Sequence, residues 1–518
     1  NTLIQNAMLY DGTGTKPYKS DLLIEGGKIK RIGRNLPVEG CACVQADGLA
    51  LAPGFINTHS HMELELFRNP ALASVIEQGV TTEVLGQDGS SVAPVTDALT
   101  EELADNMAPL AGRMEKPYFW RSFADYMRCV EEAGIAPRMV SLVGHGTIRM
   151  NVMGNDRRRP TAEELERMKA LLVKCMEEGA KGLSFGLIYP PGSYGETEEL
   201  IEMAKIVARY DGIIMVHMRN EKGKLLESIA EMNRVVEESG VRLQISHFKS
   251  LGQVNWGKVT QGLKMIQDMR DKGFDVTFDQ YPWIAACTGL KVCVPQWAYE
   301  GGETGFQQRL VQPEIYEKIR RETAEEIQVR GGGDKILIAE VATEEYGWMA
   351  GKRMDEIAQK LALPVEDAVL HILQHEGALV IAIYFSISED DVIEVMRSPL
   401  HCVCTDGIMG AYPHPRTYAS FPRFLGRYVR DIGVMPLEEA IRHITQEPAR
   451  RLRLWDRGML REGMSADLVL FDPDEIADVN SYTDPAIPPV GIKGVWVLGE
   501  YKYGAVSAAE ATNTKEGE

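Results

Sequence analysis

The middle of the chain alternates helix-like segments with short apolar runs, and no other feature restricts the fold as strongly. Residues 161–178 and 197–210 are helix-like, and each precedes a short run that is typical of a buried strand. Such runs are Gly182-Leu-Ser-Phe-Gly, Gly212-Ile-Ile-Met-Val-His, Val241-Arg-Leu-Gln-Ile-Ser-His and Asp275-Val-Thr-Phe-Asp. Repeated strand and helix units predict a parallel sheet with right-handed crossovers. A repeat of this length fits an eight-stranded TIM-like barrel better than an open sheet.

The two ends of the chain show a different pattern, in which strand-like runs are separated by glycine turns. Near the N-terminus these runs are Thr2-Leu-Ile-Gln-Asn and residues 21–33. Near the C-terminus they are Ala466-Asp-Leu-Val-Leu-Phe-Asp and Val495-Trp-Val-Leu-Gly-Glu-Tyr, each expected to form one strand. The expected fold class is therefore α/β, a TIM-like (β/α)8 barrel with a small β-sandwich domain built from both termini.

The same patterns give the expected boundaries. The β-sandwich takes residues 1–52 and 451–505, and the barrel takes residues 53–450. The alternation breaks at about 285–335, which we interpret as an insertion over the barrel mouth. Residues 506–518 are rich in Ala, Thr, Lys and Glu and are expected to form a frayed tail.

The composition argues against several classes of partner. A chain of 518 residues exceeds the size at which one core stops growing, and the net charge of −19 opposes nucleic-acid binding, which needs a positive surface. The 8 Cys lack paired CxxC spacing, so reduced thiols in a cytoplasmic protein are expected. No apolar run reaches the roughly 18 residues that span a membrane, and no signal-peptide pattern is visible. The oligomeric state stays open, and a homo-oligomer is compatible with the sequence.

Histidines gather at the C-terminal ends of the apolar runs, where a TIM barrel places its active site. The first expected barrel strand ends in His59 and His61, whose alternate positions point the same way, into the barrel. His217 and His247 end later strands, and Asp406 follows the last one. Any one of these histidines alone is more often a packing residue. Four imidazoles and a carboxylate at one mouth, however, suit zinc or a similar first-row metal.

This order of residues resembles the amidohydrolase superfamily. Its hallmark is a His-x-His pair at the end of the first barrel strand, one His at each of two later strands and an Asp at the last. Leu51-Ala-Pro-Gly-Phe-Ile-Asn and Gly463-Met-Ser-Ala-Asp-Leu-Val-Leu-Phe-Asp are similar to its passages between β domain and barrel. The resemblance therefore covers nearly the whole chain.

Within the superfamily the chain is most similar to the N-acyl-D-amino-acid deacylases, or D-aminoacylases. The matching segments are Gly79-Val-Thr-Thr-Glu-Val-Leu-Gly, Gly182-Leu-Ser-Phe-Gly-Leu-Ile-Tyr-Pro-Pro-Gly, His217-Met-Arg-Asn-Glu, Ile245-Ser-His-Phe-Lys, Asp279-Gln-Tyr-Pro-Trp, Thr405-Asp-Gly and His414-Pro-Arg-Thr-Tyr. The resemblance implies hydrolysis of small N-acyl amino acids to a carboxylate and a D-amino acid. The preference for D over L substrates rests wholly on this resemblance.

One turn departs from that family. Its members carry a Cys metal ligand in a Gly-Asn-Cys-Gly turn after the second strand, where this chain has Gly86-Gln-Asp88-Gly89. Asp88 can ligate or bridge metals, but it can also be a plain turn residue, because Asp-Gly favours turns without any metal. The departure leaves the metal open between one and two Zn²⁺, with another divalent metal also compatible.

The expected mechanism is attack by metal-activated water. The expected metal ligands are His59, His61, Asp88, His217, His247 and Asp406. The later histidines and Asp88 are expected to hold the main metal, and the His-x-His pair a second or weaker one. Asp406 is also the expected general base and acid, which takes a proton from the water and gives it to the leaving amine.

The free carboxylate of an N-acyl amino acid needs cations and hydrogen-bond donors. Lys249 and Arg416 can form such a clamp, because Arg binds carboxylates bidentately and Lys supplies a point charge; both can instead be solvated surface charges. The resemblance adds Tyr281 and Thr288 to the clamp. Two further sets stay open between function and packing: His145 and Arg149 as ligands or support, and Trp283, Trp297 and Tyr299 as walls for the acyl group.

Other functions remain open. A cyclic-amide hydrolase of the hydantoinase or dihydroorotase type shares the His-x-His pair and the final Asp, but usually places a modified Lys at a strand end. Lys181 lies before its strand and is discounted for that role. A deaminase would leave the carboxylate clamp unexplained, and a non-catalytic binding protein would normally have lost metal ligands.

Overall fold

The computed structural model describes residues 1–114 and 118–506. Its central feature is a ring of parallel strands that pair in chain order. These strands are β6 (Phe55–Asn57), β7 (Val80–Leu85), β8 (Arg138–Ser141), β9 (Val143–Gly144), β10 (Gly182–Gly186), β11 (Ile213–His217), β12 (Arg242–Ile245), β13 (Val276–Gln280) and β17 (His401–Val403). Only Leu142 separates β8 from β9, and its N–H donates to Leu85 O, so these two segments form one strand position. A parallel bridge between Ser60 and Gly407 joins the first position to the last and closes an eight-position barrel.

Strand alternation decides which side chains enter the barrel. In β11, Ile213 and Met215 belong to an apolar cluster inside the barrel, whereas Ile214 and Val216 pack against the surrounding helices. His217 continues the inward set at the C-terminal end of this strand. A period of two residues therefore places an imidazole at the barrel mouth.

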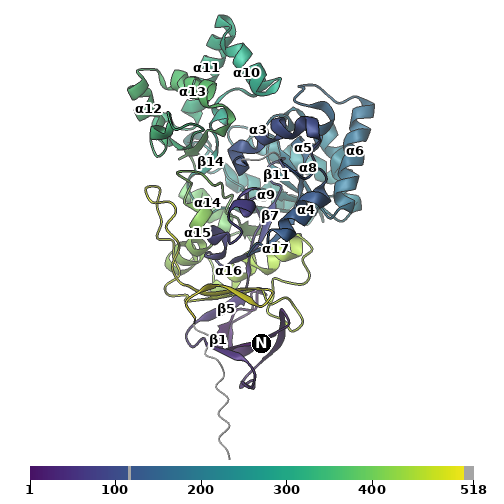
Figure 1. Cartoon of the computed structure of the whole chain (residues 1–518), viewed down its shortest axis with the longest axis vertical. Helices are drawn as coiled ribbons and strands as arrows, with labels where there is room; N and C mark the ends of the chain where they lie inside the picture. The colour runs from purple at the N-terminus through teal and green to yellow at the C-terminus, as the bar shows by residue number, and fades with distance from the viewer. Residues whose placement is uncertain (115–117, 507–518) are drawn as a thin grey trace, which may run out of the picture.

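Helices surround the barrel and connect its strands (Figure 1). They are α1 (Glu65–Arg68), α2 (Ala73–Ile76), α3 (Thr100–Ala111), α4 (Phe123–Glu132), α5 (His145–Met153), α6 (Ala162–Glu177), α7 (Thr197–Arg209), α8 (Leu225–Ser239), α9 (Lys258–Asp271), α14 (Glu389–Met396), α15 (Arg416–Arg423), α16 (Leu437–Ile444) and α17 (Gln446–Arg451). The two helices expected from the sequence are α6 and α7. The start of α6 is set by a capping box, in which Thr161 and Glu164 satisfy each other's backbone N–H groups. 

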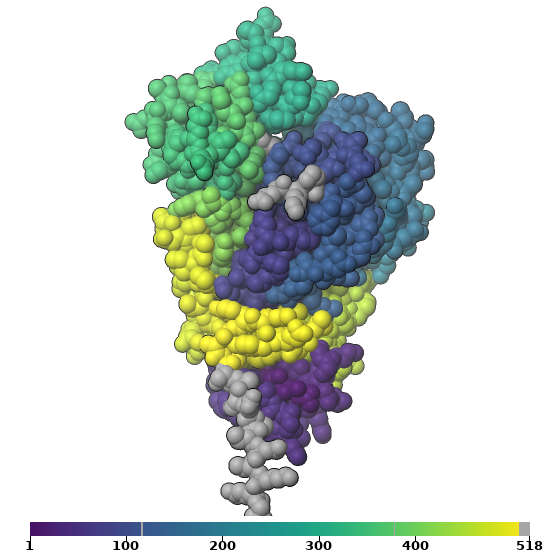
Figure 2. Space-filling view, viewed as in Figure 1, coloured from purple at the N-terminus to yellow at the C-terminus, as the bar shows by residue number. Residues whose placement is uncertain are grey.

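Strands from both termini form one hydrogen-bonded sheet below the barrel. They are β1 (Thr2–Leu9), β2 (Tyr18–Glu25), β3 (Lys28–Gly33), β4 (Ala42–Gln45), β5 (Ala50–Pro53), β18 (Leu468–Phe471), β19 (Ile492–Val497) and β20 (Glu500–Gly504). β5 pairs with β1 on one side and with β18 on the other, so it joins the two ends of the chain. Figure 2 shows the C-terminal segments as a belt between the N-terminal strands and the barrel. The predicted fold class is confirmed.

The C-terminal hairpin corrects one strand prediction. The run Val495-Trp-Val-Leu-Gly-Glu-Tyr was expected to be a single strand, but it contains the turn between β19 and β20. Leu498 and Gly499 form this turn with φ values of 49° and 77°. Such two-residue turns favour Asn-Gly or Asp-Gly, and an apolar Leu in the first position hid the turn.

A separate lobe stands over the barrel between β13 and α14. It holds a three-stranded antiparallel sheet of β14 (Ala286–Gly289), β15 (Ile336–Glu340) and β16 (Ile381–Tyr384). Its helices are α10 (Gly302–Leu310), α11 (Pro313–Val329), α12 (Met354–Leu361) and α13 (Val365–Glu376), which Figure 1 shows at the top of the molecule. The sheet that begins in the expected insertion at 285–335 takes its other two strands from beyond residue 335.

Two further points concern the whole chain. Within residues 1–114 and 118–506, no helix combines the length and the apolar character that crossing a membrane requires. The tail predicted at 506–518 lies outside the described residues, except for Val506.

Candidate metal centre

Six His and Asp side chains from five strand ends meet at the barrel mouth. They form two groups, His59, His61, Asp88 and Asp406, and Asp88, His217 and His247. In each group, one ligand atom from every residue lies within 4.8 Å of the others, and all six residues are buried. Asp88 belongs to both groups. The expected ligands are therefore together, and a carboxylate shared by two groups is the arrangement of a two-metal site.

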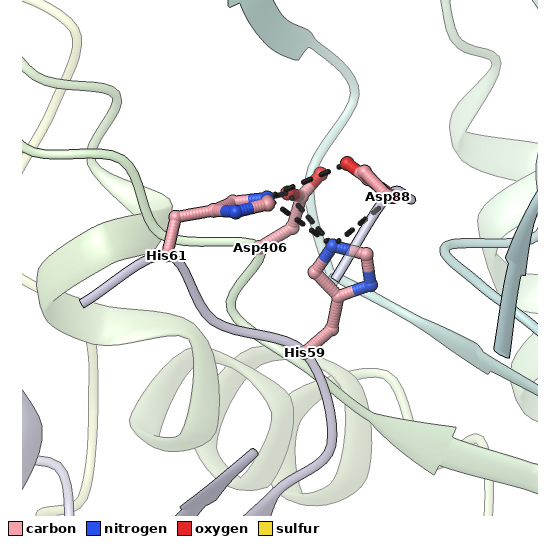
Figure 3. A group of neighbouring side chains, drawn as sticks. All are labelled: His59, His61, Asp88 and Asp406. Carbon is pink, nitrogen blue, oxygen red and sulfur yellow. Dashed lines mark hydrogen bonds and ion pairs between the residues drawn. The ribbon is translucent and has the colours of Figure 1, made fainter. Parts of the chain in front are cut away.

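The first group is drawn in Figure 3, where the two imidazoles point toward the two carboxylates. His61 Nε2 lies 3.2 Å from Asp406 Oδ1 and 3.4 Å from Asp88 Oδ2. His59 Nε2 lies 3.4 Å from Asp406 Oδ1 and 3.5 Å from Asp88 Oδ1. The two Nε2 atoms are 3.3 Å apart, so both rings present the same nitrogen to one point.

The second group lies on the other side of Asp88. Its Oδ1 atom is 3.4 Å from His247 Nε2 and 3.6 Å from His217 Nδ1. Asp88 Oδ1 and both ring nitrogens of His217 have no hydrogen-bond partner among the described residues. Buried polar atoms normally have such partners, so these atoms are arranged for a ligand that the protein itself does not supply.

The donor set fits a divalent first-row metal. Imidazole nitrogens and carboxylate oxygens are the ligands that zinc takes besides thiolate, and no thiol contributes to either group. Burial disfavours charge on His61, but Asp406 and Asp88 outweigh it and raise the pKa of His61 to about 10. Burial also disfavours charge on Asp88 and by itself would raise its pKa, but the surrounding histidines hold this pKa well below the usual range. Asp88 is thus anionic, and a metal would displace the extra proton from His61.

The Gly86-Gln-Asp88-Gly89 turn fits tightly against neighbouring strands. A Cβ on Gly86 would collide with Leu142 O, and one on Gly89 would collide with Gly186 N. Gly89 N–H donates to Ser184 Oγ at 3.0 Å, and Gly89 O accepts from Gly146 N–H at 2.8 Å. These contacts fix the Asp88 backbone from both sides, so its carboxylate has a defined position.

Three of the six donor residues have a backbone conformation that L-residues rarely adopt. Asp88, His247 and Asp406 have φ values of 55°, 38° and 47°. Hydrogen bonds hold two of them: His247 N–H donates to Asp279 Oδ1 at 2.6 Å, and Asp406 N–H donates to His59 O at 3.0 Å. Strained backbone of this kind persists where the surroundings enforce it, and it clusters at functional sites.

Glu221 supports the second group from outside. Its Oε1 atom lies 3.0 Å from His247 Nδ1, and its Oε2 atom lies 3.5 Å from His217 Nε2. One carboxylate therefore faces the outer nitrogens of both rings, a contact that orients metal-binding histidines. Burial raises the pKa of Glu221, but Lys249 and the two histidines lower it well below the usual range.

The four residues expected to bind a substrate carboxylate lie in two places. Lys249, Tyr281 and Thr288 line a small cavity of about 30 Å³ together with Asp88, His217, His247 and Asp406. Tyr281 Oη has no hydrogen-bond partner in the described residues, and Thr288 Oγ1 lies 2.9 Å from Tyr189 Oη. Arg416 instead lies behind Asp406, with Nη2 3.0 Å from Asp406 Oδ2 and its guanidinium stacked on Tyr281.

The small cavity borders a larger one. The larger cavity has a volume of about 640 Å³, and Ile188, Tyr189, His217, Glu221, Leu251, Val292 and Arg330 line both. About 30 Å³ accommodates little more than one or two waters, so only the reacting group of a substrate fits beside the donors. The rest of a substrate must occupy the larger space, whose walls come from the barrel and from the lobe above it.

The comparisons with known proteins agree with this geometry. A family model described as amidohydrolase family matches residues 42–503. The chain belongs to the amidohydrolase family. It is 33% identical over 503 residues to a D-aminoacylase of Alcaligenes xylosoxydans xylosoxydans, across 96% of this chain and 93% of that protein.

Two solved structures resemble this amidohydrolase over nearly their whole length. One is an N-acyl-D-glutamate deacylase from Bordetella bronchiseptica, complexed with zinc and a phosphonate inhibitor that mimics the reaction's tetrahedral intermediate. It is 30% identical, with a TM-score of 0.84 and coverage of 97% of this chain and 96% of that one. The other is a D-aminoacylase with a binuclear metal centre, which is 29% identical with a TM-score of 0.83 and 98% coverage of both chains.

Other sequence candidates lie outside the metal centre of this amidohydrolase. His145 belongs to neither donor group; its Nε2 lies 2.7 Å from Glu199 Oε1, and Arg149 Nη1 lies 2.5 Å from Glu199 Oε2. This buried cluster lies at the start of α5, whose Gly146 holds the Asp88 turn. Lys181 lies before β10, away from the donors at the C-terminal ends.

Of the three aromatic residues left open between acyl-site walls and packing, one lines a cavity. Tyr299 lines the larger cavity, but Trp283 and Trp297 line neither cavity. Trp283 instead donates to Ser420 Oγ at 3.0 Å, and Trp297 donates to Glu322 Oε2 at 2.8 Å. Both indoles satisfy their N–H groups in packed surroundings, which a sequence position beside an active-site segment does not reveal.

The sequence analysis missed three residues at these cavities: Tyr189, Glu221 and Arg330. Tyr189 and Glu221 lie within segments that carried the family resemblance, but neither was given a role there. Arg330 follows α11 in the lobe, and no sequence signal linked it to the barrel mouth.

Proposed function

We propose that this amidohydrolase hydrolyses N-acyl-D-amino acids, releasing a carboxylate and a D-amino acid, with Zn²⁺ as its metal. The observation that carries the proposal is the meeting of six His and Asp donors beside a cavity lined by Lys249, Tyr281 and Thr288. Similarity to a D-aminoacylase at 33% identity and to a zinc-bound N-acyl-D-glutamate deacylase at 30% supports the substrate class and the metal.

Asp406 is the proposed general base and acid. Burial raises the pKa of Asp406, but Arg416 and His59 outweigh this effect and hold the pKa well below the usual range. A carboxylate of low pKa is a weak base and takes a proton only from an acidified water. A divalent metal held by the donors of these groups would supply that acidity and would polarise the scissile carbonyl. Asp406 then returns the proton to the leaving amine.

The substrate carboxylate is proposed to bind at the part of the small cavity that Lys249, Tyr281 and Thr288 line. Tyr281 Oη offers a free hydrogen-bond donor, Thr288 offers a hydroxyl, and Lys249 supplies positive charge. Lys249 also donates to Glu221 Oε1 at 2.8 Å, which fixes its ammonium beside the donors. Arg416 contacts Asp406 and stacks on Tyr281, so it orients the general base. Its direct contact with the substrate stays a prediction.

The test is turnover of a panel of N-acetyl D- and L-amino acids by zinc-loaded protein, followed by chiral detection of the released amine. We expect D-amino acids to be released, and we expect a chelator to abolish this release. Asp406→Asn is expected to lower kcat by about 10²–10⁴-fold, the usual contribution of a general base, with little change in KM.

Metal content must be measured for each sample, because Asp406 is also a proposed ligand. Arg423→Gln is a matched control, since Arg423 pairs with Asp478 and lines neither cavity. Absence of release from every substrate, with metal confirmed bound, would exclude the deacylase function. Full activity of a metal-loaded Asp406→Asn protein would exclude the role of Asp406.

A further inference from the structure

The larger cavity is lined by five cations and four carboxylates: Arg219, Lys222, Lys291, Arg321 and Arg330, and Glu221, Glu322, Glu325 and Glu326. Lys249 is one of the proposed groups for the substrate carboxylate, and Arg219 is fully engaged by Glu231 and the carbonyls of Ser193 and Gly195. Of the other cations in the wall, Lys222 is held by Glu326 and Arg321 is exposed. Lys291 and Arg330 are withdrawn from solvent and are less fully engaged. They raise the question of what anion this part of the cavity accepts.

Arg330 is the buried member of this pair. Its side chain is 6% exposed and lines both the larger cavity and the small cavity beside the donors. The guanidinium stacks on the Tyr384 ring at 4.5 Å, which fixes its plane. Its Nε atom lies 2.9 Å from Glu326 Oε1, yet has no hydrogen-bond partner among the described residues. A guanidinium has five N–H donors, so most of its binding capacity is unused.

Glu326 does not account for this cation. Both of its oxygens are held by Lys222, whose Nζ lies 2.6 Å from Oε1 and 2.7 Å from Oε2. At this point of the wall, one carboxylate thus faces two cations. Lys222 alone is enough to neutralise Glu326, so Arg330 is not needed for that purpose.

Lys291 adds a second point of positive charge. Its side chain is half-buried at the boundary of the larger cavity and makes no ion pair or hydrogen bond within residues 1–114 and 118–506. Burial lowers the pKa of this ammonium more than Glu303 raises it, so a further anion in the cavity would stabilise its charged form.

We propose that Arg330, with Lys291 beside it, forms a subsite for a second carboxylate of the substrate. The inference rests on the proposed function and narrows its substrate class to N-acyl-D-amino acids with two carboxylates. The second carboxylate can belong to the amino-acid side chain or to the acyl group, because the small cavity has room only for the reacting group and the rest of a substrate must enter the larger one. Arg suits this role, since its planar fork binds a carboxylate bidentately.

The experiment compares substrates that differ only in that charge. N-Acetyl-D-glutamate and N-acetyl-D-glutamine test the side chain, and N-succinyl-D-leucine and N-acetyl-D-leucine test the acyl group. In one pair, we expect the dicarboxylate to have a kcat/KM about 10–100-fold higher than that of its neutral partner, mainly because its KM is lower. This factor is what one charge-assisted hydrogen bond contributes. The pair that shows this preference identifies the source of the second carboxylate.

Variants assign the preference to residues. Arg330→Gln is expected to remove the preference while leaving kcat/KM for the neutral substrate within about 3-fold, and Arg330→Lys is expected to restore part of it. Lys291→Met is expected to reduce the preference without removing it. Arg321→Gln is the matched control, because Arg321 lines the same cavity but is exposed, so solvent screens its charge. Circular dichroism and thermal unfolding report whether each variant folds.

Two results separate this inference from the proposed function. Turnover of the neutral substrates without preference for either dicarboxylate would overturn the subsite and leave the deacylase function intact. If no substrate is turned over, calorimetry measures how tightly each substrate binds to metal-loaded Asp406→Asn protein, and the affinities within each pair are compared. Tighter binding of N-acetyl-D-glutamate or N-succinyl-D-leucine than of its neutral partner, lost in Arg330→Gln, would support the subsite. Equal binding within both pairs would overturn it.

Discussion

Asp88 presents a single oxygen to three imidazoles. Its Oδ1 atom lies 3.4–3.6 Å from nitrogens of His59, His217 and His247, and its other oxygen faces His61. A turn residue without a ligand role would not need to face four rings. The geometry therefore favours the ligand interpretation over the turn interpretation that the sequence left open, and a substitution can separate the two.

Asp88→Asn is expected to weaken metal binding by at least about 10–100-fold. Residues that only contact the ligands of a metal typically contribute that factor, and a direct ligand should contribute no less. Asn is well matched, because it adopts positive φ as readily as Asp and keeps the side-chain size. Asp88→Cys retains an anionic ligand and is expected to favour softer metals such as cadmium. Metal content after dialysis against buffered zinc or cadmium measures both effects. Unchanged zinc affinity in Asp88→Asn would show that Asp88 only makes the turn.

At the residue scale, the sequence predicted the six donors at the strand ends. It gave no role to Tyr189 and Glu221, which follow β10 and β11, or to Arg330. Strand alternation and parallel pairing force His59, His61, His217 and His247 to one mouth, so their convergence follows from simple geometry. Arg330 comes from the end of a helix in the lobe, and its place depends on how that lobe packs over the barrel. Spacing in the sequence carries no information about such packing.

Among the elements, the short helix α17 has an unusual concentration of charge. Glu447 pairs with Arg450, Arg451 and Arg442 of α16, and Arg451 also donates to Phe278 O and Leu400 O. This network ties the last helices to β13 and to the residues before β17. Burial raises the pKa of Glu447, but the three arginines lower it to about 2.

A carboxylate with a lowered pKa stabilises the fold above its unfolded pKa, and this contribution is lost as the pH falls through the folded pKa. For Glu447 the shift from 4.5 to about 2 corresponds to ~3 kcal/mol. Glu447→Gln is therefore expected to lower the free energy of unfolding by up to that amount at pH 6, and the difference from wild type should shrink between pH 4.5 and 2. Urea unfolding across this pH range measures it. Glu438→Gln on α16 is the control, and a difference that stays constant with pH would contradict the electrostatic explanation.

Element prediction was accurate where a regular period extended over a whole segment. The barrel helices and strands have such periods, and α6 and α7 lie within about a residue of the expected ranges. The hairpin at Leu498 and the sheet of β14, β15 and β16 were not recognised, because an apolar turn and pairing between distant segments leave no local period. Both depend on contacts that only the folded chain defines.

At the scale of the whole molecule, the terminal sheet belongs to two cores at once. Leu468, Leu470 and Trp496 face a cluster within the β domain, whereas Val469, Phe471 and Val495 face the cluster that includes barrel residues. Gly54 N–H also donates to Asp467 O at 2.7 Å, where the first barrel strand begins. The β domain therefore supports the strand that carries His59 and His61, and the two units should unfold together.

Trp496→Ala tests this coupling, because Trp496 is 2% exposed in the core that joins strands from both ends of the chain. Loss of a buried indole is expected to lower the free energy of unfolding by about 3–5 kcal/mol. Urea unfolding followed by circular dichroism and by loss of bound metal should show both signals shifting together to lower urea. Trp455→Ala is the matched control, since Trp455 is 63% exposed and its loss should cost less than about 1 kcal/mol. Metal release at the wild-type urea concentration, with only the circular dichroism signal shifted, would show instead that the barrel holds its metal centre without help from the terminal sheet.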